Sequence, residues 1–117
     1  MGYCTRYDLD IIGHNLTDFE FHEYYNRVEE DLLKTLEEMN ILDYAFNTSF
    51  ESCDEVKWYE HEEDMREISK KFDSLVFILS GEGEDNFDSW RKYFLNGKMQ
   101  ECRARITYDS YDEKKLM

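Results

Sequence analysis

The period of the apolar residues changes within the first forty positions, and this change most constrains the fold. From Tyr3 to Ile12, apolar or β-branched residues alternate with polar ones, which predicts a half-buried strand. From position 18 to 39 the apolar residues recur every three or four positions, which predicts one long amphipathic helix. Thr17 and Glu20 form a capping-box pattern at its start, and Asn40 is expected to end it.

The same patterns divide the middle of the chain. Residues 44–50 alternate and predict a strand, while residues 56–59 predict either a short strand or the start of the next helix. A second helix is expected from about 60 to 72. Its inner face is predicted to carry His61, Met65, Ile68 and Phe72. Five consecutive apolar residues, 75–79, predict a strand buried on both faces.

A β-hairpin is the most local of the predictions. Asn96-Gly97 separates two alternating segments, 90–95 and 98–108, and this dipeptide favours a two-residue type I′ turn. The turn sets the register of the two strands. It places Lys92 opposite Glu101, Trp90 opposite Arg103 and Asp88 opposite Arg105.

These elements together predict an α+β fold. We expect a two-layer sandwich with two helices on one face of a mainly antiparallel sheet, and a ferredoxin-like topology is the nearest named arrangement. A chain of 117 residues with 19 aromatic side chains has the bulk for one core. The predicted single domain spans 1–108, followed by a polar tail, 109–117.

The formal charge of the chain lies entirely in its first half. Residues 1–64 carry 18 acidic and 4 basic side chains, whereas residues 65–117 carry 10 of each. A one-sided acidic field repels nucleic acid and anionic lipid and attracts basic surfaces. The charge therefore predicts a basic protein as partner, without direct contact to nucleic acid or membrane; it does not predict the oligomeric state.

Cysteine usage and hydropathy predict a reducing compartment. The chain has an odd number of cysteines, and none of them belongs to a CxxC motif; they are Cys4, Cys53 and Cys102. The sequence contains no apolar run of the length that spans a bilayer. We therefore expect an intracellular protein with three thiols.

Candidate catalytic and metal-binding patterns are incomplete. His61-Glu62-Glu63-Asp64 resembles the start of a zinc-protease helix, but Met65 stands where the second histidine is required. The Gly81–Asp85 segment is too acidic for a phosphate loop; a plain turn is favoured, with a weak cation site or a partner contact as alternatives. No base is predicted beside a cysteine thiol. We expect no catalytic residue, no metal, no cofactor and no enzyme activity.

The first predicted helix is the candidate binding surface. A helix of about 22 residues is about 33 Å long. The 14 surplus negative charges of the chain equal the phosphate charge on about 24 Å of duplex DNA. The two scales are similar, so mimicry of a phosphate backbone is feasible; an ordinary solvated amphipathic helix is the alternative. The predicted partner-binding residues are Glu23, Glu30, Asp31, Glu37 and Glu38.

Several segments resemble a family of small bacteriophage proteins. They are Met1–Tyr7, Lys57–Met65, Ser80–Asp85, Trp90, Tyr93-Phe94 and Asn96-Gly97-Lys98. The resemblance does not extend to the acidic helix or to residues 40–54, and Asp73 lies where the family often has a proline nearby. It implies a phage or prophage gene, and with it a location in the cytoplasm of the bacterial host. It gives no activity or catalytic residue.

Charge and resemblance together lead to one main hypothesis. Small acidic phage proteins include inhibitors of host restriction and CRISPR nucleases, so by analogy we expect a non-enzymatic, anti-CRISPR-like inhibitor that mimics nucleic acid. One alternative is a phage accessory module that binds protein through its sheet or its Trp90 face. Another is a module that binds a small molecule or nucleotide between helices and sheet.

Overall fold

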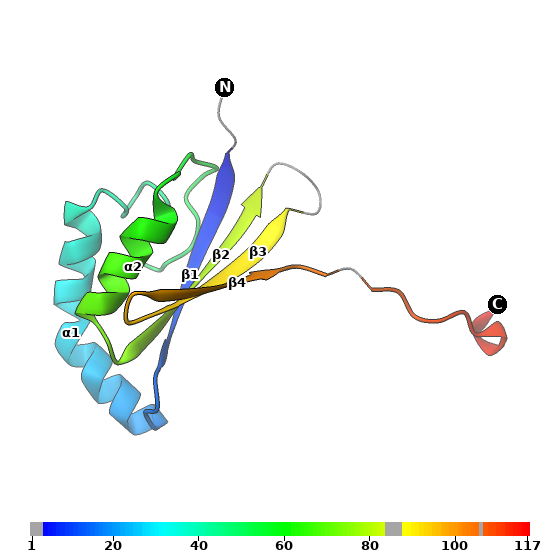
Figure 1. The fold of residues 1–117 in the computed structure, drawn as a ribbon, viewed down its shortest axis with the longest axis horizontal. Helices are drawn as coiled ribbons and strands as arrows, with labels where there is room; N and C mark the ends of the chain where they lie inside the picture. The colour runs from blue at the N-terminus through cyan, green and yellow to red at the C-terminus, as the bar shows by residue number, and fades with distance from the viewer. Residues whose placement is uncertain (1–3, 84–87, 106) are drawn as a thin grey trace.

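The fold is an α+β sandwich of two helices and one four-stranded sheet (Figure 1). The computed structural model describes residues 4–83, 88–105 and 107–117. The elements in chain order are β1 (Thr5–Gly13), α1 (Asp18–Glu38), α2 (His61–Lys71), β2 (Leu75–Gly83), β3 (Ser89–Leu95), β4 (Lys98–Arg103) and the 3₁₀ turn η1 (Glu113–Lys115). The predicted α+β class is confirmed.

The sheet is antiparallel throughout, with strand order β1-β2-β3-β4. Both helices lie in the connection between β1 and β2 and on one side of the sheet (Figure 1). The expected ferredoxin-like topology is therefore wrong, because that topology requires a strand between its two helices.

Residues 44–50 do not form the predicted strand. Between the helices, pairing is limited to isolated bridges, and Asp43 and Phe50 have positive φ angles. Ala45 and Phe46 are consecutive and both fully buried, which does not fit a strand with one buried and one exposed face. Instead, residues 50–56 run along the outer edge of β1, where Val56 exchanges two backbone hydrogen bonds with Thr5.

Helix α1 begins and ends as the sequence predicts. The Thr17 hydroxyl accepts from the Glu20 N–H, and the Glu20 carboxylate accepts from the Thr17 N–H. At the other end, Asn40 has φ 61°, and the Ile41 N–H donates to the Leu36 carbonyl, as in a Schellman cap. These caps fix where the chain enters and leaves the helix layer.

Strand β2 is longer and less enclosed than predicted. Leu75, Phe77 and Leu79 are buried beneath the helices, but Val76 and Ile78 on the opposite face are only half-buried. The expectation of burial on both faces is therefore wrong. Gly81–Gly83 belong to β2 rather than to a turn, and the rest of that predicted turn lies outside the described residues.

The hairpin register is confirmed. Trp90 pairs with Arg103, and Leu95 pairs with Lys98 across Asn96-Gly97. Two details of the hairpin are wrong: β4 ends at Arg103 rather than at 108, and Arg103 rather than Arg105 contacts Asp88, at 2.8 Å. Beyond β4, every described residue is exposed, and the chain runs away from the sheet (Figure 1).

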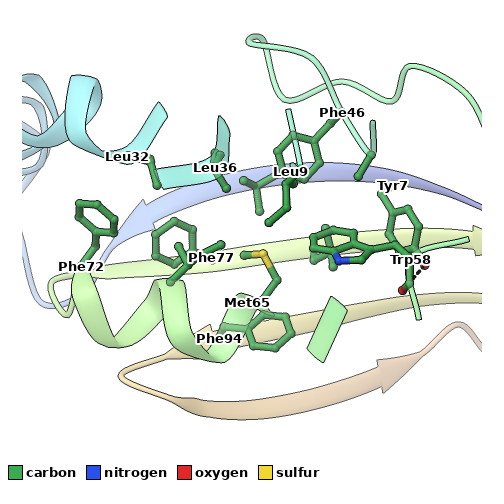
Figure 2. Packing of buried hydrophobic residues seen from close by; sticks show 14 of the residues in the cluster. Tyr7, Leu9, Leu32, Leu36, Phe46, Trp58, Met65, Phe72, Phe77 and Phe94 are labelled. Atoms are coloured by element: carbon green, nitrogen blue, oxygen red, sulfur yellow. Dashed lines mark hydrogen bonds between the residues drawn. The ribbon is translucent and has the colours of Figure 1, made fainter. Parts of the chain in front are cut away.

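The core lies between the helices and the sheet (Figure 2). Leu32 and Leu36 of α1 and Met65 of α2 point toward Phe77 at its centre. Phe46 closes the core from the loop between the helices. The predicted inner faces of both helices are thus confirmed, and neither of the described helices α1 and α2 lies on the opposite face of the sheet.

Candidate functional site

The five predicted binding residues are all on α1 and all exposed. Glu23, Glu30 and Glu37 are seven residues apart, so they follow one line at intervals of about 10.5 Å. This line faces away from the buried side of the helix, which carries Leu32 and Leu36.

Basic side chains interrupt this acidic line. Arg27 and Lys34 lie one helical turn from the glutamates and on the same outward side. The Arg27 guanidinium lies over the Tyr24 ring at 5.7 Å. The outward row of α1 therefore alternates in sign, and its charge density is lower than that of a continuous row of carboxylates.

Asp31 differs from the other four acids because it has an ionic partner within the chain. Lys71 of α2 places its Nζ 3.3 Å from the Asp31 carboxylate and also donates to the Thr35 hydroxyl. This contact joins the two helices. Within the described part of the chain, the carboxylates of Glu23, Glu30, Glu37 and Glu38 make no ion pair.

A second cluster, centred on Lys92, was not predicted as a site. Lys92 projects from β3 toward the helices, and its side chain is only 6% exposed. Its Nζ lies 2.8 Å from the Glu62 carboxylate and 3.7 Å from that of Glu101. The same ammonium lies 4.2 Å from the centre of the Trp90 ring. Two carboxylates and one ring thus surround a buried cation.

His61 completes this cluster as a neutral imidazole. Its Nδ1 lies 2.8 Å from the Trp58 carbonyl, which can only accept, so Nδ1 carries the proton. Its Nε2 then accepts from Lys92 at 2.7 Å. Burial lowers the pKa of the His61 imidazole, and the hydrogen bond from Lys92 lowers the pKa of the Glu62 carboxyl. Both shifts favour the protonation states that this network requires.

Aromatic rings form the walls around the cluster. His61 stacks on Trp90 with centroids 5.1 Å apart, and Tyr7 meets Trp58 edge-on at 5.2 Å. The Trp90 ring lies so close to Gly81 that a Cβ there would overlap it. A cavity of about 270 Å³ opens beside these rings, with Tyr59, Asp88 and Arg103 also in its lining.

The Lys92 cluster fastens the start of α2 to the sheet. The amine is occupied by His61 and Glu62, so it is not poised to attack a substrate. Part of it was visible in the sequence: the hairpin register predicted the Lys92–Glu101 pair, and alternation along β3 places Lys92 on the same face as Trp90. Its contacts with α2 were not predicted.

The other sequence candidates do not form sites. Within the residues that the structure describes, no three His, Cys, Asp or Glu side chains come together in a way that could hold a metal ion. Cys53 is exposed, whereas His61 faces the Lys92 cluster. Of the described helices, none combines the length and the apolar character required to cross a bilayer.

Comparisons with protein families, with curated proteins and with solved structures give no match to this chain. The resemblance to bacteriophage proteins therefore remains a prediction from the sequence.

Proposed function

We propose that this chain is a non-catalytic binding protein whose acidic α1 surface engages a basic, nucleic-acid-binding protein. The observation that carries the proposal is the exposure of Glu23, Glu30, Glu37 and Glu38 without ionic partners in the described residues. A carboxylate that is not neutralised within its own chain remains available to a basic partner. A phage-encoded inhibitor of a host defence nuclease is the biological role to test first.

The charge balance of the whole chain supports the same partner class. The formal net charge is −14, and it comes from residues 1–64, which include α1. A field of this sign accelerates encounter with a positively charged cleft and disfavours direct binding to nucleic acid. The occupied Lys92 amine supports a binding role over a catalytic one.

Charge reversal on α1 tests the proposal. The triple variant E30K/E37K/E38K should weaken binding to a basic nuclease complex severalfold to a hundredfold, because each exposed charge contributes some tenths to about 1 kcal/mol. The matched control reverses Asp109 and Asp112 in the exposed tail and should leave affinity almost unchanged. Isothermal titration calorimetry in about 50 mM and about 300 mM salt measures the affinity of both variants and its salt dependence. Circular dichroism verifies that both are folded. If the folded triple variant binds as tightly as the wild type in low salt, binding by this surface is refuted.

A gain-of-affinity variant sharpens the test. Arg27 and Lys34 interrupt the acidic row, so R27E/K34E should strengthen binding if a basic partner lies along this face. An ordinary solvated helix gives no such gain. An unchanged affinity in this variant, together with a loss in the triple variant, would move the contact toward Glu38 and the end of the helix.

The uncovered face of the sheet favours a second candidate function, protein binding without charge mimicry. Ile12 on that face is 46% exposed and pairs with the half-buried Val76. Further along the same face, Ile78 pairs with Tyr93, and both are half-buried. Binding through this apolar face would depend little on salt, whereas binding through α1 would weaken steeply as salt rises. The small-molecule alternative would use the cavity beside Trp90.

A further inference from the structure

We infer that two copies of this chain pair through the outer edges of their β4 strands to form an antiparallel dimer with one continuous eight-stranded sheet. The inference is independent of the proposed function, since it concerns the side of the molecule opposite β1. It is carried by the open backbone edge, the order of charges along β4 and the distribution of charge between the halves of the chain.

The two edges of the sheet differ in how their backbone groups are satisfied. At the β1 edge, Thr5 and Leu9 bond to residues 50–56, and the Asp10 carboxylate accepts from the Ile11 N–H. At the other edge, β4 pairs only with β3 among the described residues. The sheet therefore has one closed edge and one open edge.

The hairpin register shows which β4 residues face outward. The Ala104 N–H donates to Ser89, so the even-numbered positions of this strand bond inward to β3. The backbone groups of Met99, Glu101 and Arg103 consequently point away from the sheet. An antiparallel partner strand can bond to these positions and extend the sheet.

The charges on β4 are self-complementary in one register. If the two-fold axis passes through Cys102, Glu101 of each copy lies directly opposite Arg103 of the other, which gives two opposite-charge pairs. Shifting the axis to Glu101 would place two carboxylates opposite each other. Edge charges commonly block pairing with other strands, whereas here they favour the alignment centred on Cys102 over the one centred on Glu101.

The net charge also favours this edge as the contact between copies. Residues 65–117, which contain β2, β3 and β4, carry 10 acidic and 10 basic side chains. The surplus of 14 negative charges lies in the half that forms β1 and α1. Pairing through β4 brings the neutral halves together and keeps the acidic halves apart, where salt screens their repulsion.

Mass measurement and a complementation pair of variants test the dimer. At about 100 μM, a concentration well above a micromolar dissociation constant, light scattering after size exclusion should give twice the 14.3 kDa of one chain.

E101K alone and R103E alone place like charges opposite each other, so each should raise the dimer dissociation constant by about fivefold or more. An equal mixture of the two variants should recover the dimer, because each opposed pair at positions 101 and 103 then joins one basic and one acidic side chain. Failure of the mixture to recover it, with both variants folded, would overturn the register.

Cross-linking provides a test that needs no change of charge. Opposed residues at a non-hydrogen-bonded position lie about 4.5 Å apart between Cα atoms, which suits a disulfide. In the C53S background, mild oxidation with diamide should link Cys102 to Cys102 between copies, as mapped by mass spectrometry; C53S/C102S is the control. A monomeric mass up to about 1 mM, with no Cys102 cross-link, would overturn the inference.

Discussion

Replacing Lys92 by methionine tests how much the buried cluster stabilises the fold. Lys92→Met keeps an unbranched side chain, shorter by one heavy atom, and removes its charge. The variant loses the hydrogen bonds to Glu62 at 2.8 Å and to His61 at 2.7 Å, together with the cation–π contact to Trp90. We expect a folded protein of lower stability.

Two opposing effects set the size of this loss. Hydrogen bonds to charged groups contribute about 1.5–3 kcal/mol each, and a cation–π contact contributes about 0.5–2 kcal/mol. Against them, methionine does not incur the desolvation cost of a buried ammonium, and apolar replacements of buried ion pairs are often neutral or stabilising. Here the partners remain: His61 Nε2 loses its donor, whereas Glu62 and Glu101 are 44% and 37% exposed and can be hydrated. The net loss should therefore be about 2 kcal/mol.

Urea unfolding followed by circular dichroism measures this difference directly. A loss of about 2 kcal/mol should lower the melting temperature by about 5–10 °C in a chain of this size. Lys98→Met on the neighbouring strand is the matched control, because Lys98 is exposed, and it should change stability by less than about 0.5 kcal/mol. A Lys92→Met protein as stable as the wild type would show that the desolvation cost fully offsets the network, and a net stabilising role for the cluster would be refuted.

Three further changes examine other parts of the structure. Folding lowers the pKa of His61, so on acidification the imidazole binds a proton in the unfolded chain before it does so in the folded one. The free energy of unfolding, measured by urea titration, should therefore decrease as the pH falls below about 6.5. His61→Asn should remove this pH dependence. Gly81→Ala should cost about 1–3 kcal/mol by displacing the Trp90 indole, detected as a shift in tryptophan fluorescence; an unshifted spectrum would contradict the close packing. Thr17→Ala should cost about 0.5–2 kcal/mol through loss of the capping box, whereas Thr48→Ala, at an exposed site outside the helices, should cost less in the same thermal melt.

The elements predicted correctly are those whose signals are local. The capping box of Thr17 and Glu20 and the Asn96-Gly97 turn each act within a few residues, so their geometry follows from the sequence around them. Residues 44–50 failed because their environment is set from a distance: Phe46 enters a core built by other elements, and Phe50 bonds to the edge of β1. Alternation alone could not distinguish this loop from a strand.

The binding surface and the buried cluster differ in the same way. Exposed acids on α1 follow from helical period and charge, so all five were placed correctly on the helix surface. The ion pair that occupies Asp31 depends on how α1 and α2 pack, which their separate patterns do not encode. The contacts of Lys92 with His61 and Glu62 likewise join elements about thirty residues apart.

The insertion of both helices between β1 and β2 has a consequence for the order of folding. β2, β3 and β4 are joined by short connections and can pair as soon as they are made, whereas Gly13 must find Leu75 and Thr5 must find Gly83. Closing so long a loop is slow relative to forming a hairpin. We therefore expect the three C-terminal strands to pair first and β1 to dock last, so a nascent chain that ends before residue 75 holds its first strand without β2, its neighbour in the sheet.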